Sequence, residues 1–349
     1  MSTVDSSAAS SAPPDAAAAR LLFQAATGYV VSAALHVAVS LQIVEQLSGG
    51  PKAVRDLAAG AGVPEDGLYR VLRALTTAGI FAEVAPKTFA VTPAALLLRK
   101  GAGALGDGVE FFCDPLHLRA YGEMLYSVRT GQSAGAKVVG MPLFEYLARN
   151  PEYSAIFNDA MTSFSANVMP AVLQAYDFSG IGVLVDVAGG HGHVLTSVLQ
   201  KYPSMRGVLF DIAHVIAGAQ PLIDAAGVAD RVRTESGDFF REVPAGGDAY
   251  IMKHIIHDWD DDRSLTILRN IHTRLEGRPG GRLILLEAVV PADNTPHLSK
   301  LLDIEMMLMP GGRERTEQEF AALLEAAGFA LTRIVPNESM LSVIEGRPR

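Results

Sequence analysis

The second half of the chain alternates short apolar runs with segments in which apolar residues recur at helical spacing. The apolar runs predict strands over 183–187, 207–210, 231–235, 249–253 and 282–287. The helical spacing predicts helices over 193–201, 215–226 and 261–275. Repeated strand–helix units with apolar strands are typical of a parallel, doubly wound α/β sheet, in which the carboxyl ends of the strands meet at one ligand-binding edge.

A further helix and two strands are expected to close this sheet. Thr316-Glu-Gln-Glu319 has the capping-box pattern that opens a helix, and this helix is expected to reach Ala327 and to end at Gly328. Apolar patterning over 331–335 and 340–345 predicts the closing strands.

The first half of the chain has a helical pattern. Residues 21–47 carry little charge on any face, which predicts a buried helix, and burial against a second copy would make the protein a dimer. Two short helices are expected over 53–59 and 65–78, followed by a hairpin of strands 80–84 and 88–91. This order resembles a winged helix. Residues 142–169 are again expected to be helical, whereas the Gly-rich stretch 101–140 has no clear pattern.

A winged helix either binds DNA or serves as a structural dimerisation module. The second helix carries Glu65 and Asp66 against Arg70 and Arg73, so it is locally neutral, and the whole chain has a net charge of -9. Helices that read DNA need basic and amide side chains facing the groove. We therefore expect dimerisation and no nucleic-acid partner.

Composition narrows the setting of the protein. Hydrophobic residues make up 49% and charged residues 19% of the chain, which supports a large folded core. A single cysteine, Cys113, allows no intrachain disulfide and suits the cytoplasm. Residues 1–19 are rich in Ser, Ala and Pro without the pattern of a signal peptide, so they are expected to be a disordered tail. The stretch 28–44 is too polar for a good membrane span, so no membrane partner is expected.

A glycine-rich turn follows the first predicted strand, in the sequence Leu184-Val-Asp-Val-Ala-Gly-Gly-His-Gly-His-Val-Leu195. Gly189, Gly190 and Gly192 are expected to take positive φ and to let the backbone approach a ligand closely. The third small residue of the dinucleotide fingerprint is missing, and Asp186 would disfavour a pyrophosphate at this turn. A carboxylate here suits a ligand that carries a positive amino group.

Two more acids follow successive predicted strands. Asp211 lies about twenty residues beyond the glycines, where a carboxylate accepts ribose hydroxyls. Asp238 is placed to accept from an adenine amino group, and Phe239 to lie against the adenine ring. Each acid alone could instead cap a helix, but three acids at successive strand ends predict an adenosine that carries an amino acid. S-adenosylmethionine (SAM) fits this description.

The fourth predicted strand runs into Tyr250-Ile-Met-Lys-His-Ile-Ile-His-Asp-Trp-Asp260 at the same edge of the sheet. With this stretch, the chain from Leu21 onward resembles the caffeic-acid and flavonoid O-methyltransferases and their bacterial relatives that methylate polyketides and other aromatic metabolites. The motifs that carry the resemblance are Asp-Val-Ala-Gly-Gly-His-Gly (186–192), Lys-His-Ile-Ile-His-Asp-Trp (253–259), Leu-Leu-Glu-Ala (285–288) and Gly-Gly-Arg-Glu-Arg-Thr (311–316).

The resemblance implies a Rossmann-like class I methyltransferase domain over 176–349, a winged-helix dimerisation domain over 20–100 and a helical segment over 101–175 that contributes to the substrate pocket. It makes His257 the general base, with Glu287 and Glu314 orienting it. The implied cofactor residues are Asp186, Gly189, Gly190, Gly192, Asp211, Asp238, Phe239, Lys253 and Ser165. The implied substrate residues are Phe157, Met161, Asp258, Trp259 and Met307.

One residue departs from the family pattern. The family usually has glycine where this chain has Ala188, whose methyl group is expected to tighten the turn without abolishing cofactor binding.

The chemistry agrees with a histidine base. A phenol has a pKa of about 10, so little of it is ionised at neutral pH, and a histidine can take the proton while the new bond forms. A carboxylate on the other ring nitrogen would fix the tautomer, and Glu287 is at a strand end from which it could reach. No metal is required, and His191, His193 and His254 do not form a convincing ligand set, so they are expected to be structural or to line the pocket.

A set of apolar residues indicates a roomy pocket for a flat acceptor, but the sequence does not identify that acceptor. These residues are Phe111, Phe112, Phe157, Met161, Phe164, Trp259, Met306, Met307 and Met309. Three alternatives stay open: a SAM-binding relative that decarboxylates or hydroxylates its substrate, an N-methyltransferase, and a cofactor-responsive DNA-binding regulator.

Overall fold

The computed structural model describes residues 15–101 and 103–349, and it divides the chain after Ala94 into two compact units. The expected helical segment 101–175 belongs to the same unit as the large sheet.

The first unit combines helices with a small sheet. Its helices are α1 (Ala16–Ser40), α2 (Ile43–Gln46), α3 (Val54–Ala61) and α4 (Glu65–Thr76), and α5 (Pro93–Leu96) follows at the boundary. Its strands are β1 (Lys52–Ala53), β2 (Phe81–Ala85) and β3 (Thr88–Val91), in the order β1-β3-β2. The expected two helices and hairpin are therefore confirmed, with the apolar side of α4 buried through Leu68, Leu72 and Leu75.

Helix α1 corrects two expectations. It begins at Ala16, where the Asp15 side chain accepts from the backbone N–H of Ala17, so residues 16–19 are helical and only 1–14 of the expected tail lie outside the described residues. The expected burial of its apolar side chains is wrong within this chain, because Leu21, Leu22 and Phe23 are 67–71% exposed. By length and composition alone α1 could also cross a membrane, which is a weak indication for a single helix near the N-terminus.

Among the described residues, six helices lie between α5 and the first strand of the large sheet. They are α6 (Gly106–Phe112), α7 (Pro115–Gly122), α8 (Met124–Thr130), α9 (Ala134–Val139), α10 (Leu143–Arg149) and α11 (Pro151–Ala175). The single helix expected over 142–169 is two helices, because Asn150 leaves the helical conformation and Pro151 starts α11 at its first turn.

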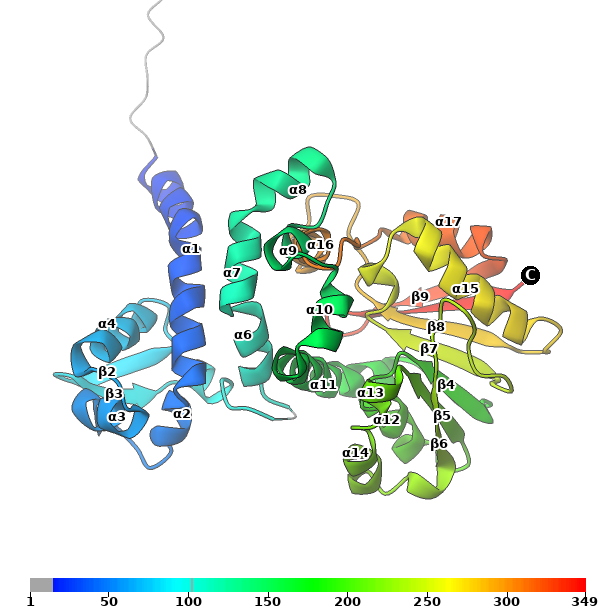
Figure 1. Ribbon diagram of the computed structural model, residues 1–349, viewed down its shortest axis with the longest axis horizontal. Coiled ribbons are helices and arrows are strands. Elements are labelled where there is room, and N and C mark those ends of the chain that lie inside the picture. The colour runs from blue at the N-terminus through cyan, green and yellow to red at the C-terminus, as the bar shows by residue number, and fades with distance from the viewer. Residues whose placement is uncertain (1–14, 102) are drawn as a thin grey trace, which may run out of the picture. The chain divides into compact units, whose positions relative to one another are not determined.

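The large sheet has seven strands in the order β6-β5-β4-β7-β8-β10-β9 (Figure 1). The parallel strands are β4 (Val183–Val187), β5 (Arg206–Asp211), β6 (Val232–Ser236), β7 (Ala249–Lys253) and β8 (Arg282–Glu287). The closing strands β9 (Phe329–Val335) and β10 (Ser342–Pro348) run antiparallel to each other, and β10 is antiparallel to β8. The sheet is thus mixed rather than parallel, since the short link between β9 and β10 leaves no room for a crossover.

The core lies on both faces of this sheet. Leu184 packs in one cluster with α11 and α12 (His193–Lys201), and Val185, on the opposite face, packs in another with α15 (Asp261–Leu275) and α17 (Glu317–Ala326). The remaining elements are α13 (Ala213–Ile216), α14 (Gln220–Ala225), α16 (Ser299–Leu308) and the 3-10 turns η1 (Ala229–Arg231) and η2 (Ile256–Asp258). The helix expected over 215–226 is divided into α13 and α14.

Candidate active site

The turn after β4 has the tight conformation that its glycines predict, with one difference. Gly190 and Gly192 have φ of +60° and +87°, but the third residue with positive φ is Ala188, at +56°, and Gly189 is not among them. Gly189 is required for another reason. A Cβ on it would lie 2.5 Å from Leu209 Cδ1 and 2.6 Å from Asp186 Cγ, so the close packing of the turn excludes a side chain there.

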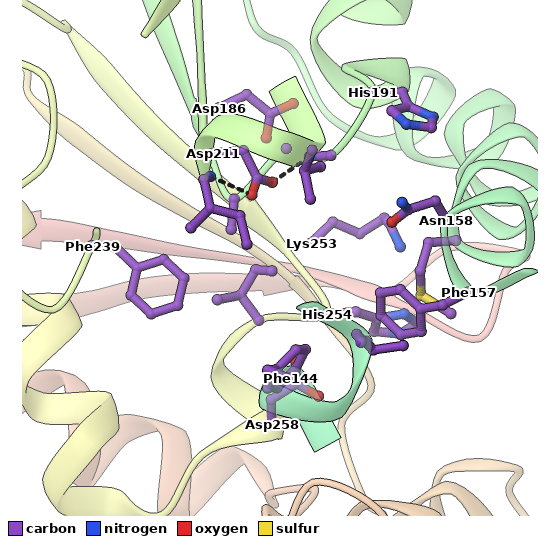
Figure 2. Close-up of a pocket in the computed structure, with 18 of the residues that line it drawn as sticks. Phe144, Phe157, Asn158, Asp186, His191, Asp211, Phe239, Lys253, His254 and Asp258 are labelled. Carbon is purple, nitrogen blue, oxygen red and sulfur yellow. Dashed lines mark hydrogen bonds between the residues drawn. The ribbon is translucent and has the colours of Figure 1, made fainter. Parts of the chain in front are cut away.

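The three acids expected at strand ends line one cavity, as Figure 2 illustrates for Asp186 and Asp211. Asp186 is 1% exposed, and burial raises its pKa to about 7. Asp211 accepts from the backbone N–H groups of Gly190 at 2.8 Å and Ile212 at 2.7 Å. Asp238 accepts from the backbone N–H of Phe240 at 2.9 Å. Each acid thus also stabilises its own local turn.

This cavity, of about 300 Å³, has a polar end and an aromatic end. The polar end is formed by the loop after β4, the three acids and Lys253, whose pKa burial lowers to about 8. The aromatic end includes Phe144 and Trp259, stacked with ring centroids 5.3 Å apart. The predicted residues that line the cavity are Phe157, Met161, Ser165, Asp186, Gly189, Gly190, Asp211, Asp238, Phe239, Lys253, Asp258 and Trp259.

Five predicted site residues do not line the cavity: Gly192, Met307, His257, Glu287 and Glu314. Gly192 is the N-cap residue of α12. Met307 is half-buried and packs against a cluster that includes Leu308 and Met309 rather than lining the cavity. His257, at 5% exposure, lies next to the cavity-lining residues His254 and Asp258. The other apolar residues expected in the pocket, Phe111, Phe112, Phe164, Met306 and Met309, also do not line it.

Two buried acids lie beside Nδ1 of the His257 ring. Its Nδ1 lies 2.7 Å from Glu314 Oε1 and 3.9 Å from Glu287 Oε2. Glu314 is therefore the hydrogen-bonding carboxylate, which corrects the expectation that Glu287 reaches this nitrogen. Glu287 Oε1 instead accepts from the backbone N–H groups of Ile255 and Ile256, at 3.0 and 2.9 Å, and so fixes the segment that leads to His257.

Burial raises the pKa of both acids, that of Glu314 to about 8. The 2.7 Å contact places Glu314 to share a proton with Nδ1 of His257. Nε2 faces away from this pair, and its ionic neighbour is Asp258 Oδ1 at 3.6 Å. The arrangement leaves Nε2 to take a proton from a bound molecule.

The same three side chains also have the spacing of a cation site. One ligand atom from each of His257, Glu287 and Glu314 lies within 4.8 Å of the others. A metal would need the nitrogen that the 2.7 Å hydrogen bond to Glu314 occupies, so the geometry favours proton sharing.

Two motif residues, His254 and Arg315, make contacts at this site for which the sequence alone indicates no catalytic role. His254 has φ of +54° and stacks on His257, and its Nε2 is buried without a hydrogen-bond partner among the described residues. Arg315 is 1% exposed and contacts the segment that carries His257. The only available signal for Arg315 was its place in the motif 311–316, because a lone arginine beside an acid usually forms a surface pair.

Comparison with known proteins assigns both parts of the chain. Residues 121–330 match the model of the O-methyltransferase domain, and residues 23–101 match that of the O-methyltransferase dimerisation domain. A phenazine O-methyltransferase from Lysobacter antibioticus is 41% identical over 334 residues, which cover 94% of this chain and 96% of the relative.

Solved structures agree. The crystal structure of LaPhzM matches with a TM-score of 0.91 and 40% identity, covering 95% of this chain and 99% of that one. The S-adenosylhomocysteine (SAH)-bound methyltransferase CalO1 of calicheamicin biosynthesis matches with a TM-score of 0.83 and 33% identity, covering 97% and 100%. The class I methyltransferase fold with an N-terminal dimerisation domain is therefore confirmed, and this chain belongs to the SAM-dependent O-methyltransferase family.

Proposed function

We propose that this enzyme methylates a hydroxyl group of a small, flat aromatic metabolite, with His257 as the general base. The observation that carries the proposal is the 2.7 Å contact between His257 Nδ1 and Glu314, buried next to a cavity with acids at one end and aromatic rings at the other. The phenazine O-methyltransferase relative supports an aromatic acceptor.

The polar end of the cavity fits SAM. Asp186 is a buried carboxylate beside the glycine turn, and it suits the amino group of the methionine part. Asp211 suits the ribose hydroxyls, and Asp238 with Phe239 suits the adenine. Lys253, at the polar end, and Ser165 also line the cavity. When bound, SAM supplies the methyl group that the acceptor oxygen takes.

The protein's own part in the reaction is to orient the acceptor and to remove a proton. Phe157, Met161 and Trp259 hold the flat ring, which lowers the entropic barrier to attack. Nε2 of His257 takes the proton of the acceptor hydroxyl as the new carbon–oxygen bond forms. Glu314 stabilises the resulting imidazolium by accepting from Nδ1. The products are the methyl ether, SAH and one proton, and the chemistry assigns no step to a metal.

The functional unit that we propose is a homodimer in the cytoplasm. The dimerisation domain leaves apolar side chains of α1 exposed, among them Leu21, Phe23 and Tyr29, and a second copy would cover them. Neither a nucleic acid nor a membrane is expected as a partner.

The first test is binding. Calorimetric titration with SAH should give micromolar affinity, and NAD should not bind. SAH formation from SAM in a panel of phenols should then identify the acceptor class. Binding of NAD, or of neither ligand, would contradict the cofactor assignment.

Product analysis separates the alternatives. A second panel replaces the hydroxyl of each phenol with an amino group. Methylation of these anilines, but of none of the phenols, would favour N-methylation. A decarboxylated or hydroxylated product formed without SAH would favour the alternative of a SAM-binding decarboxylase or hydroxylase.

A further inference from the structure

The loop that carries Glu314 packs along the segment that carries His257. The backbone N–H of Arg313 donates to the carbonyl oxygen of His257 at 2.8 Å, next to the Glu314 contact. A Cβ on Gly312 would lie 2.0 Å from that carbonyl oxygen, so only glycine allows the two backbones to come this close.

Arg315 contacts the same segment at both ends. Its Nη1 donates to the carbonyl oxygen of Ile256 at 3.0 Å, and its Nη2 donates to that of Trp259, also at 3.0 Å. These two carbonyls flank His257 and Asp258 in the sequence. One guanidinium group therefore fixes the start and the end of the short segment that presents the base.

The setting of this guanidinium is unusual for a surface loop. The Arg315 side chain is 1% exposed, whereas its ionic partner Asp261, at 2.7 Å, is 57% exposed. Nη2 of Arg315 also donates to Ser264 Oγ at 3.3 Å. A buried charge needs both an ionic partner and hydrogen-bond acceptors, and the planar fork of arginine supplies a geometry that lysine lacks.

We propose that Arg315 is a positioning residue for methyl transfer, because its guanidinium holds the carbonyls of Ile256 and Trp259 and so sets the direction of His257 Nε2. This role rests on the proposed function of His257 as the base. Arg315 itself is not expected to touch the cofactor or the acceptor.

The charge of Arg315 adds a second effect. Burial and Asp303 raise the pKa of Glu314, and the positive charge of Arg315 opposes this rise. Loss of the charge should therefore make the His257–Glu314 pair hold its proton to higher pH. The other charged or titratable groups around the pair are His254, Asp258 and Glu287, with Lys253 beside them.

Two substitutions separate the hydrogen bonds of the Arg315 guanidinium from its charge. Arg315→Met keeps the aliphatic stem but loses both the charge and the hydrogen bonds. Arg315→Lys keeps the charge but loses the fork. The matched control is Arg231→Met. Arg231 likewise donates to backbone carbonyls, those of Leu199, Tyr202 and Met205, but it lies directly before β6, at the amino end of that strand.

The measurements are SAH affinity by calorimetry, the NMR titration of the His257 imidazole, assigned with His257→Gln, and turnover of the phenol found in the panel. We expect both Arg315 variants to bind SAH within about threefold of the unchanged protein and to lose on the order of 10²-fold in kcat. Arg315→Met should also move the titration of the pair to higher pH, whereas Arg315→Lys and Arg231→Met should not.

The proposal is overturned if Arg315→Met titrates and turns over like the Arg231→Met control. If Arg315→Met does not fold, Arg315→Lys decides, since unchanged kcat in that variant contradicts the role of the fork. The titration needs no acceptor. It therefore tests whether the Arg315 charge acts on the His257–Glu314 pair even if loss of His257 leaves activity intact and the proposed base is wrong.

Discussion

The imidazole rings of His254 and His257 lie parallel, with their centroids 4.5 Å apart and 11° between their planes. Burial, with the neighbouring charges of Lys253 and His257, lowers the pKa of His254 well below its usual value, so this ring is neutral at pH 7. A neutral aromatic face stabilises a cation that lies on it. If His257 is the base that we propose, His254 is therefore placed to stabilise the imidazolium that would form when His257 takes the proton.

Two substitutions of His254 should distinguish the contribution of its flat ring to kcat from that of its ring nitrogens. His254→Phe keeps a ring and should retain most activity, whereas His254→Leu should lower kcat by about 2- to 30-fold, the equivalent of about 0.5–2 kcal/mol. The measurement is turnover at saturating SAM. His272→Leu, which removes a ring that contacts Phe329 away from the cavity, is the control. Equal losses in His254→Phe and His254→Leu would contradict a stacking role.

Ala188 adopts a backbone conformation that favours glycine. Its φ of +56° strains a residue with a Cβ by about 1–2 kcal/mol. Ala188→Gly relieves this strain but loses about 0.4–1 kcal/mol because the unfolded chain becomes more flexible. We expect a net rise in the free energy of unfolding of about 0 to 1.6 kcal/mol, measured by denaturant unfolding, with little change in SAH affinity.

The inverse substitution gives the control. Gly227 has φ of +67°, with open space around it, and lies away from the cavity, so Gly227→Ala should destabilise the protein by a similar amount. A lower unfolding free energy in Ala188→Gly would mean that the strain at Ala188 is smaller than its φ indicates.

The sequence predicted the parallel strands, the glycine turn and most of the cavity residues, because these depend on local patterns. It did not predict the antiparallel direction of β9 and β10, since strand direction depends on how the chain returns to the sheet. The apolar pattern of α1 predicted burial, but the described chain leaves that surface open. Which acid reaches His257, and the role of Arg315, depend on contacts between residues far apart in the sequence.

Cofactor binding should depend on pH through Asp186. Burial raises its pKa to about 7, so in the ligand-free protein this carboxyl is largely protonated at about pH 6 and ionised at about pH 8. If Asp186 binds the ammonium group of SAH, affinity should rise between these pH values. Calorimetry should show that rise in the unchanged protein and a flatter, weaker response in Asp186→Asn. A pH-dependent rise that persists in Asp186→Asn would assign the effect to another group.

The unfolding free energy should depend on pH through Asp186 in the opposite direction. A carboxyl whose pKa is raised in the folded state lowers stability as pH rises from about 4 to about 7. Ligand-free Asp186→Asn should therefore gain stability relative to the unchanged protein at about pH 8.

A second buried group predicts a different pH response. His117 is fully buried between Asp114 and Glu305, and although burial lowers its pKa, hydrogen bonds to both acids raise it to about 9. This stabilisation, on the order of 3 kcal/mol, is complete below about pH 6.5 and is lost as pH rises through about 9. Denaturant unfolding at about pH 6.5 and at about pH 9 should show a lower free energy of unfolding at the higher pH in the unchanged protein. His117→Gln should be less stable at the lower pH and should lack the loss.

The most direct test of the account is the effect of His257→Ala on turnover and on SAH affinity, measured on the same preparation. We expect kcat/KM for the phenol acceptor to fall by about 10²–10⁴-fold, while calorimetric SAH affinity stays within about threefold of the unchanged protein. Full turnover in His257→Ala, with SAH still bound, would contradict the assignment of His257 as the general base.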